Sequence, residues 1–519
     1  MTRRDAVLSG LAIMVLTFLG FANPLWQIPL TALALPGGLY CIGVASPSRK
    51  TAFVRGLLAG GLAYAACLYW VAVPVHDYGF MPWVLAAPCP VLLGLVMGCY
   101  AGAYTVLARI AGRRLRPPWS ALAAGIFWGA LEGLRGVLFT GFTWLALPSA
   151  FVPWPDMLQT ASLVGSDGLA AILAFLAVLP WAGFFAKGLR TRARLGWLAA
   201  GIAGMIILGF IGSVGPLFLP PETGTARVAL VQGNIDQSLK WNPAFQRGTV
   251  DRYVRLTTHA VTDSPMDINL VIWPETAMPF YFQENNVLSL RVRQLAEDLG
   301  TALLLGSPGY KRDQDGLQYF NRAFLLDSHG ETAGYYDKEH LVPFGEYIPF
   351  GRYLPFLTKL VQGVGDFTSG THSGPLVVPA NGNTPRLKLG VLTCYETIFP
   401  ELARRRAQKG SSVLVNISND AWFGRTSAPM QHLQLSALRA VEEGRTLLRA
   451  TNTGISAIVE PGGRIRTTTP LFEEATVEAE VSLHEGLTPY GRFGGLILPI
   501  LIGIGMLIMF YAIRRQPDA

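Results

Sequence analysis

Residues 386–401 read RLKLGVLTCYETIFPE, and within them a short apolar run ends abruptly at Cys394. Such a run, stopping at a reactive residue, is typical of a buried strand that delivers a side chain to the rim of a sheet. Cys394 is therefore the candidate nucleophile. A cysteine at a strand end is more often a small core residue than a catalyst, so its surroundings must decide between the two.

Cys394 is the single thiol of the polar part of the chain. The other cysteines lie upstream, in segments apolar enough to be embedded in a membrane: Cys41, Cys67, Cys89 and Cys99. Because no second thiol occurs in its part of the sequence, Cys394 is predicted to have no disulfide partner.

The composition predicts an integral membrane protein of several domains, since 51% of the 519 residues are hydrophobic and only 15% are charged. A net charge of +8 is compatible with nucleic-acid binding. However, Lys and Arg fall largely in short clusters between apolar segments, which is how membrane topology is encoded, so no nucleic-acid partner is expected. No His/Cys cluster has metal-ligand spacing, and no Gly-rich phosphate loop joins a strand to a helix. The sequence therefore predicts neither a metal nor a cofactor.

Eight apolar segments predict eight transmembrane helices, since each is near the ~20 residues that cross a bilayer as a helix. They cover about residues 6–22, 27–44, 53–75, 83–110, 119–139, 169–186, 195–210 and 494–513. Alternate loops are basic, at Arg3/Arg4, Arg49/Lys50/Arg55, Arg113/Arg114/Arg116 and Lys187/Arg190/Arg192/Arg194. By the positive-inside rule both termini are expected in the cytoplasm, with the polar part between the seventh and eighth spans on the outer side.

One charged pair lies inside the fifth predicted span. Glu132 and Arg135 are three residues apart, so their opposite charges share one face of the helix. Ionisable residues at membrane depth are functional candidates by default. A mutually satisfied pair that only orients the helix is an equal alternative.

The polar part of the chain, residues 220–485, is long enough for one α/β domain. Strands are predicted at residues 227–231, 268–273, 302–305, 323–326, 387–393, 412–417 and 455–459. Helices are predicted at residues 243–261, 286–299, 400–405 and 430–443. Strands alternating with helices favour a layered α/β sandwich, in which chemistry sits at the carboxyl ends of strands. The predicted units are residues 1–214 with seven helices, 220–485 with the catalytic domain, 494–513 with the eighth helix, and 514–519 as a cytoplasmic tail.

Three residues occupy such positions in the α/β part: Glu275 after VIWP, Lys338 in YYDKEH and Cys394 in GVLTC. Taken alone, Glu275 would be interpreted as a surface carboxylate, Lys338 as a member of a solvated charge run, and Cys394 as a core thiol. Together they supply a base for the thiol proton, a cation for thiolate and oxyanion, and the nucleophile. Acyl transfer through a thiol requires all three.

The ordered motifs WPE at 273–275, DKEHLVPFGEYIP at 337–349 and CYE at 394–396 resemble the nitrilase superfamily, whose Glu-Lys-Cys triad sits on a four-layer αββα sandwich. Three further motifs narrow the resemblance to bacterial apolipoprotein N-acyltransferases: LVQGNIDQSLKW at 230–241, NISNDAWFG at 416–424 and LLRATNTGISA at 447–457. The implied fold is a nitrilase-like α/β sandwich inserted before the last helix of an eight-helix transmembrane bundle.

The resemblance implies transfer of a fatty acyl chain from a membrane glycerophospholipid to the N-terminal amine of a diacylglyceryl apolipoprotein. It implies a multi-pass protein of the bacterial inner membrane with a periplasmic catalytic domain. Glu275 is the implied general base, Lys338 stabilises the tetrahedral intermediate, and Cys394 becomes the thioester.

The resemblance also implies supporting roles outside the triad, for Glu346, Tyr395, Glu396 and the substrate-contacting Trp241. For Glu346 and Glu396 a purely structural role in placing Lys338 is an equal alternative. Trp422 and Phe423 are expected in an apolar wall or lid near the membrane, with a simple core role as the alternative.

The chemistry of a thiol agrees with this reaction. An ester and a thioester are close in free energy, so acylation of a thiolate is reversible, whereas final transfer to an amine forms an amide. The backbone N–H of Tyr395 and the Lys338 ammonium could form the oxyanion hole. Two rival interpretations are a membrane-anchored amidase or nitrile hydrolase with the same triad, and a transporter or receptor with a catalytically dead outer domain. The intact triad and the scarcity of ionisable residues in the spans argue against the second.

Overall fold

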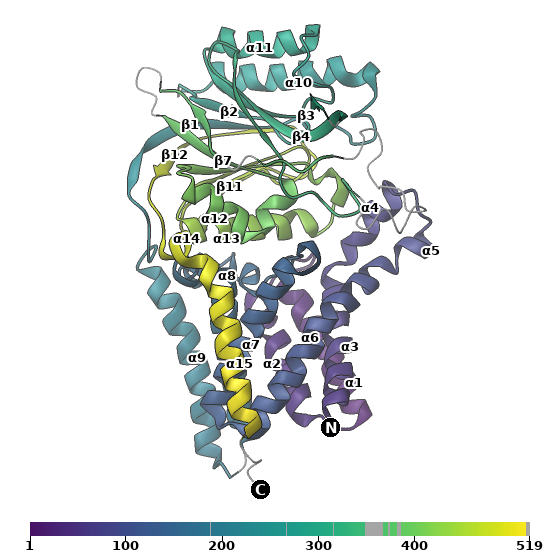
Figure 1. Cartoon of the computed structure of the whole chain (residues 1–519), viewed down its shortest axis with the longest axis vertical. Helices are drawn as coiled ribbons and strands as arrows, with labels where there is room; N and C mark the ends of the chain where they lie inside the picture. Colours follow the sequence, from purple (N-terminus) through teal and green to yellow (C-terminus); the bar gives the residue numbers. More distant parts are fainter. Residues whose placement is uncertain are drawn as a thin grey trace.

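The protein has two halves, a bundle of long helices and a body of two stacked sheets lying over one end of it (Figure 1). The structure is a computed structural model. It describes residues 1–186, 188–265, 267–314, 316–347, 367–371, 374–380 and 386–514. Lys187, the end of the 337–349 motif and residues 515–519 of the predicted tail lie outside these ranges.

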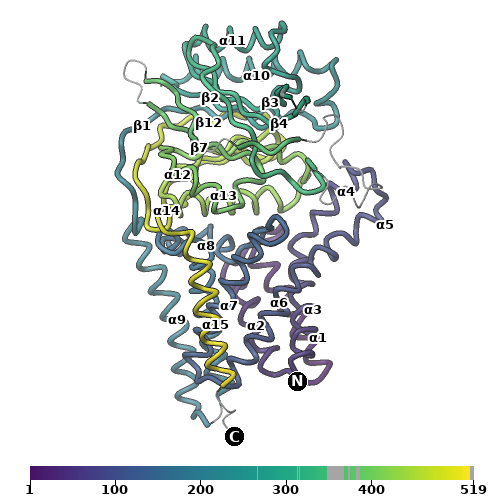
Figure 2. Tube along the Cα trace, viewed as in Figure 1, coloured from purple at the N-terminus to yellow at the C-terminus, as the bar shows by residue number. Residues whose placement is uncertain are grey.

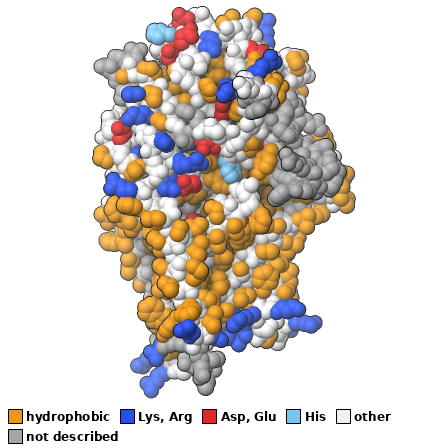
Figure 3. Space-filling view, viewed as in Figure 1, with side chains coloured by type: hydrophobic (Ala, Val, Ile, Leu, Met, Phe, Trp, Pro, Cys, Tyr) orange, Lys and Arg blue, Asp and Glu red, His pale blue; other side chains and the backbone are white. Residues whose placement is uncertain are grey.

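The helical half is built from segments at both ends of the chain. Its helices are α1 (Arg3–Gly20), α2 (Ala34–Ala45), α3 (Arg49–Cys67), α4 (Ala72–Asp77), α5 (Trp83–Ala86), α6 (Cys89–Arg114), α7 (Pro117–Val137), α8 (Ala161–Phe185), α9 (Thr191–Ser213) and α15 (Ile497–Arg514). The start of α1 and the end of α15 lie at the end of the bundle remote from the sheets (Figure 2). On the face shown in Figure 3, hydrophobic side chains cover this half, and Lys and Arg gather at its far end. This is the surface of a multi-pass membrane protein.

Each of the eight predicted spans falls on helical segments, but some cover more than one helix, and in the part of the chain that the structure describes fewer than eight helices meet the requirements for a span. Among the described residues, five are long and apolar enough to cross a membrane, or six if one bent pair is a single span. That pair, Arg49–Cys67 and Tyr69–Asp77, bends by 62°. The helix α1 has 18 residues including three charged ones, and the apolar helix at Pro29–Ala45 is short. The count of eight therefore stays a prediction.

The charged pair of the fifth predicted span is buried in α7. Arg135 Nη2 lies 3.9 Å from Glu132 Oε1, and the same oxygen accepts a hydrogen bond of 2.9 Å from the backbone N–H of Leu147. The Glu132 carboxylate therefore ties α7 to the segment that follows it, while Glu132 Oε2 and Arg135 Nε have no hydrogen-bond partner within the described ranges of the chain.

The sheet body contains two six-stranded sheets, ordered β12-β1-β2-β3-β4-β5 and β11-β10-β9-β8-β7-β6. The strands of the first are β1 (Glu222–Gln232), β2 (Leu270–Ile272), β3 (Ala302–Asp313), β4 (Gly316–Leu326), β5 (Thr332–Asp337) and β12 (Ala475–His484). Those of the second are β6 (Leu376–Val378), β7 (Leu387–Thr393), β8 (Val413–Ser418), β9 (Leu447–Thr451), β10 (Ala457–Val459) and β11 (Ile465–Thr468). The centre of each sheet is parallel, at β1-β2-β3 and β7-β8-β9.

Successive side chains of a strand point to opposite faces of its sheet, and this alternation explains the layers of the sheet body. In β1, Val228 and Leu230 pack between the two sheets, whereas Ala229 and Val231 pack beneath the outer helices. Those helices are α10 (Pro243–Thr262) and α11 (Val287–Leu299). The other face of the second sheet is covered by α12 (Pro400–Gln408) and α13 (Ala428–Glu443), and the short α14 (Pro489–Phe493) leads into α15. The predicted αββα sandwich is confirmed, and its α12–α13 layer rests on the helical half.

All seven predicted strands and four predicted helices of this body are present, with ends within a few residues except where β1, β3 and β4 run longer than expected. Five strands were not predicted: β5, β6, β9, β11 and β12. The short β6 is an apolar run of only three residues, and the mostly exposed β11 carries little apolar pattern. In β12, however, Val477, Ala479, Val481 and Leu483 alternate with more exposed residues, a signal that the prediction missed.

Candidate active site

Three strand ends bring the predicted triad together. Glu275 follows β2, Lys338 follows β5, and Cys394 follows β7 of the opposite sheet. All three residues are buried, with Lys338 only 1% exposed. The three candidate residues therefore lie where the carboxyl ends of strands from both sheets meet.

The nucleophile sits on a strained turn. Cys394 has φ of +49°, in the left-handed region that residues other than glycine rarely adopt. It is the first residue of a 3-10 helix, Cys394–Ile398, which begins directly where β7 ends. This sharp change from strand to helix presents the thiol at the sheet edge, and strain of this kind is concentrated at functional sites.

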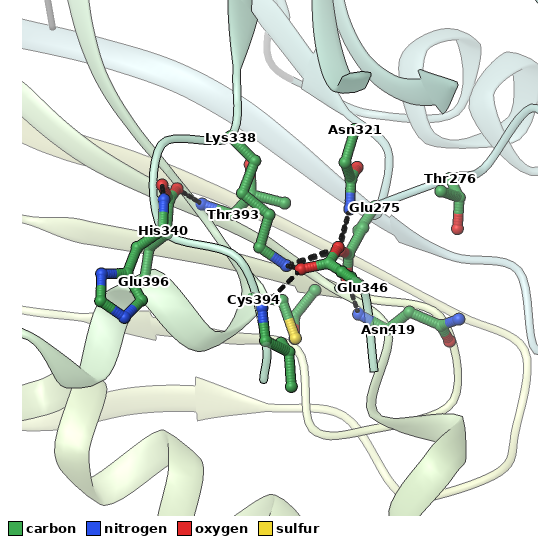
Figure 4. Close-up of polar contacts among 12 residues, drawn as sticks. Glu275, Thr276, Asn321, Lys338, His340, Glu346, Thr393, Cys394, Glu396 and Asn419 are labelled. Carbon is green, nitrogen blue, oxygen red and sulfur yellow. Dashed lines mark hydrogen bonds and ion pairs between the residues drawn. The ribbon is translucent and has the colours of Figure 1, made fainter. Parts of the chain in front are cut away.

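The Lys338 ammonium lies between two carboxylates. Its Nζ is 2.9 Å from Glu346 Oε2 and 3.4 Å from Glu275 Oε1. Figure 4 shows the Lys338 side chain pointing toward both carboxylates beside the Cys394 thiol. The arrangement holds a fixed positive charge next to the sulfur.

Hydrogen bonds from two further segments fix the Glu275 carboxylate. The Asn321 amide donates to Glu275 Oε1 across 2.6 Å and to Glu346 Oε1 across 2.9 Å. The backbone N–H of Asn419 donates to Glu275 Oε2 across 2.9 Å. Both oxygens of the proposed base therefore have donors, and the carboxylate cannot rotate without losing one (Figure 4).

Burial and charge act in opposite directions on the thiol. Burial raises the pKa of Cys394 above its usual value, Glu275 raises it further, and Lys338 lowers it in part. At Lys338, burial works to lower the pKa, but Glu346 and Glu275 outweigh it and the net pKa is raised. These directions favour a neutral thiol beside a charged ammonium, and such a thiol has to lose its proton during attack.

Glu346 and Glu396 occupy different places. Glu346 pairs directly with Lys338 and accepts the backbone N–H of Val342 at 2.8 Å. Glu396 is fully buried, accepts the backbone N–H groups of Thr393 and Glu339 at 2.6 and 2.7 Å, and is also bound by other donors, the backbone N–H of His340 and the Tyr336 hydroxyl. Glu396 therefore joins the segment that carries Lys338 to the turn that carries Cys394.

Three of the predicted aromatic residues contact the helical half: Tyr395, Trp422 and Phe423. The Tyr395 hydroxyl donates to the carbonyl of Gly141 in the helical half at 3.2 Å. The Trp422 ring packs edge-on against Tyr78 at 4.7 Å, and the Phe423 ring against Trp70 at 4.9 Å, so both contact the helical half.

Trp241 lies on the segment between β1 and α10 and is partly exposed. Its buried indole nitrogen has no hydrogen-bond partner among the residues that the structure describes. None of the contacts described above links Trp241 to the triad.

Sequence reasoning missed three buried polar residues of the site. Asn321 holds Glu275, Lys240 donates to the Thr276 hydroxyl at 2.6 Å, and His432 contacts the Cys394 carbonyl at 3.2 Å. Asn321 lies inside β4 and His432 inside α13, whereas Lys240 lies in the turn between β1 and α10, and the local sequence does not say what any of the three faces. In the described part of the chain, no three His, Cys, Asp or Glu side chains form a group that could hold a metal ion.

Two family models match the chain. The Carbon-nitrogen hydrolase model matches residues 227–486, and the model of the Apolipoprotein N-acyltransferase N-terminal domain matches residues 14–179.

Similar proteins extend over nearly the full length. An apolipoprotein N-acyltransferase of Geobacter metallireducens is 38% identical, covering 99% of this chain and 96% of its own. One of Ralstonia nicotianae is 34% identical, covering 97% and 92%. Among solved structures, a carbon-nitrogen hydrolase from Helicobacter pylori G27 aligns with 56% of this chain and 95% of its own, at a TM-score of 0.36 and 19% identity.

Proposed function

The chain belongs to the apolipoprotein N-acyltransferases, and on that premise we propose that it moves an acyl chain from a glycerophospholipid to a diacylglyceryl apolipoprotein through a thioester on Cys394. The observation that carries the proposal is the Lys338 ammonium, buried beside the Cys394 thiol and bound to Glu346 and Glu275. Membership of this family sets aside the transporter or receptor interpretation and favours acyl transfer over amide or nitrile hydrolysis.

In the first half-reaction, Glu275 takes the proton of the Cys394 thiol as the sulfur attacks the ester carbonyl of the phospholipid. The carbonyl oxygen becomes an oxyanion, which the Lys338 ammonium and the Tyr395 N–H stabilise. Collapse of this intermediate breaks the carbon–oxygen bond. The departing lysophospholipid oxygen takes the proton from Glu275, and the thioester remains.

In the second half-reaction, the free amine of the apolipoprotein attacks the thioester carbonyl. Glu275 accepts the amine proton, and the same donors stabilise the second oxyanion. Collapse breaks the carbon–sulfur bond and the thiol regains the proton from Glu275. An amide is far more stable than a thioester, so this second step drives the overall reaction to completion.

Glu346, Glu396 and Tyr395 support this chemistry in the proposal, Glu346 by holding Lys338 and Glu396 by holding the segments on either side of Cys394. Trp241, Trp422 and Phe423 contact the lipid chains. The contacts of Trp422 and Phe423 with the helical half support that assignment, because lipid substrates arrive from the bilayer. An apolar approach also excludes the water that would hydrolyse the thioester.

We place residues 1–214 and 494–513 in the bacterial inner membrane and residues 220–485 in the periplasm, with both termini and the tail at 514–519 in the cytoplasm. The basic clusters at the far end of the helical half support this orientation (Figure 3). Reporter fusions after Gly215 test it. A fusion there that is active only as a cytoplasmic reporter contradicts both the orientation and the proposed substrate.

Labelling tests the covalent step. Mixed with acyl-labelled phospholipid and no apolipoprotein, the protein is expected to retain label on Cys394 that neutral hydroxylamine releases. A diacylated lipopeptide with a free amine then moves the label into an amide. Cys394→Ala shows neither event, whereas Cys99→Ala, which removes an exposed thiol of the helical half, behaves as wild type. Prompt release of free fatty acid without a retained intermediate would identify a hydrolase instead.

A further inference from the structure

The backbone carbonyl of Cys394 is held by side chains from two other elements. His432 Nε2, from α13, lies 3.2 Å from this oxygen, and Asn416 Nδ2, from β8, lies 3.4 Å from it. Both side chains are fully buried. Neither contact involves the thiol, so these two residues act on the backbone of the nucleophile.

The surroundings of His432 assign its hydrogen. A carbonyl oxygen only accepts, so the contact with Cys394 requires the hydrogen to be on Nε2. The other ring nitrogen, Nδ1, lies 3.0 Å from Arg449 Nη2, which only donates, and 3.1 Å from Asp420 Oδ1. Burial lowers the pKa of His432, Arg449 lowers it further, and Asp420 opposes both. The neutral ring with its hydrogen on Nε2 donates to the carbonyl and accepts from Arg449. The Asp420 carboxylate takes its hydrogen bonds from other donors, the Ser418 hydroxyl at 2.8 Å and Arg449 Nη2 at 2.7 Å.

The carbonyl of Cys394 and the N–H of Tyr395 belong to one peptide unit. That unit is planar and its two polar groups point in opposite directions, so fixing the carbonyl fixes the N–H. Tyr395 is the second residue of the 3-10 helix that begins at Cys394. Its N–H therefore has no acceptor inside that helix and remains available to a ligand.

We propose that His432 is a positioning residue for acyl transfer, which by donating to the Cys394 carbonyl aims the Tyr395 N–H at the oxyanion. The proposal rests on the thioester mechanism above and adds to it the residue that orients the oxyanion hole. A donor on the carbonyl also polarises the peptide and strengthens its N–H as a donor.

His432 is held by contacts with the helical half. Its ring packs against Trp144, with ring centroids 5.2 Å apart. The preceding residue, Gln431, accepts the indole N–H groups of Trp70 and Trp144 at 3.0 and 2.9 Å and donates to the Ala22 carbonyl at 2.9 Å. The orientation of the catalytic peptide therefore depends on how α13 is seated on the membrane bundle.

A pair of variants of the full-length protein in detergent tests this role. His432→Gln keeps a nitrogen donor, whereas His432→Met has a similar shape and no donor. Two reactions of Cys394 are then compared: acylation by a labelled phospholipid, which develops an oxyanion, and alkylation by iodoacetamide, which does not. Mass spectrometry quantifies both products at Cys394, and thermal unfolding in detergent checks that each variant is folded.

His432→Met is expected to slow acylation about 10- to 100-fold, less than outright loss of an oxyanion donor, while kcat falls and KM changes little. Alkylation stays near the wild-type rate, and His432→Gln recovers most of the acylation. The matched control is Gln434→Leu on the same helix, which loses a contact with Gln27 and does not touch Cys394. It is expected to acylate at the wild-type rate.

Two results would overturn the proposal. Acylation of His432→Met at the wild-type rate would show that the hydrogen bond does not matter. A parallel fall in acylation and alkylation would show that His432 serves the thiol and not the oxyanion. Failure of the thioester mechanism itself is recognised separately, because the wild-type protein would then retain no acyl label.

Discussion

The side-chain amide of Asn321 donates to Oε1 of Glu275 across 2.6 Å, and the same nitrogen donates to Glu346 across 2.9 Å. Asn321 lies in the interior of β4, 46 residues from Glu275 in the chain. One uncharged side chain thus sets the spacing of the two carboxylates that surround the Lys338 ammonium.

Replacing Asn321 tests this spacing. Asn321→Ala is expected to slow acylation of Cys394 by about 10- to 100-fold, the equivalent of one charge-assisted hydrogen bond. Asn321→Asp is expected to do worse, because a third carboxylate beside Glu275 and Glu346 repels both. The rate of acyl-enzyme formation from labelled phospholipid measures the effect, with Gln318→Ala on the same strand as the control. If Asn321→Asp is as active as wild type, Asn321 does not order the carboxylates.

Lys338 is predicted to tolerate no other cation. The planar guanidinium of Lys338→Arg does not fit the site that a compact ammonium fills between two carboxylates, so its acyl transfer is expected to fall nearly as far as that of Lys338→Ala. Both proteins should fold, as judged by thermal unfolding in detergent. Near-normal transfer by the arginine variant would reduce Lys338 to a general electrostatic contributor.

The stability of the protein is expected to depend on pH, because the folded protein lowers the pKa of Lys240. Its ammonium is buried against the Thr276 hydroxyl, and burial lowers its pKa to about 7, although Glu275 acts to raise it. The unfolded chain holds this proton up to about pH 10.4. Between these two values the unfolded state binds more protons, so the contribution of Lys240 to the free energy of unfolding rises as the pH rises from about 7 toward 10.

The measurement compares wild type with Lys240→Met. Thermal unfolding in detergent across this range should show wild type gaining stability relative to the variant as the pH increases, with a constant difference below about pH 7. The subtraction removes the contribution of the other titrating groups. Parallel curves over the whole range would mean that the Lys240 pKa is not lowered in the folded protein.

Gln431 is predicted to hold the two halves of the protein together. Gln431→Leu leaves the buried indoles of Trp70 and Trp144 and the carbonyls of Ala22 and Cys67 without this partner. Each unsatisfied group costs about 1–3 kcal/mol, so a loss of several kcal/mol and a marked fall in Tm are expected.

Two comparisons isolate this contribution. Gln431→Glu keeps the acceptor for the indoles and loses the donors, so its Tm should lie between those of wild type and Gln431→Leu. Gln434→Leu loses a contact with Gln27 and should be the mildest change. Equal Tm values for Gln431→Leu and Gln434→Leu would contradict the role of Gln431 as the link between the halves.

The sequence by itself determined which strand ends carry the candidate catalytic residues. Apolar runs ending at Cys394 and before Glu275 mark strand ends, because a buried strand must be apolar and a polar residue can only follow at the sheet edge. The alternation of predicted strands with predicted helices determined the layered sandwich. Long apolar segments with basic flanks determined the membrane half. These properties are local, since each depends on the character of residues close together in the chain.

The tertiary structure alone decided which polar side chains complete the site. Asn321, Lys240 and His432 reach Glu275, Thr276 and Cys394 from other elements, and Gln431 reaches Trp70 across 361 residues of chain. Such partners are selected because a buried polar group must find a hydrogen bond wherever packing places it. Local sequence fixes which residues are buried, and only the packing of distant elements fixes what each one faces.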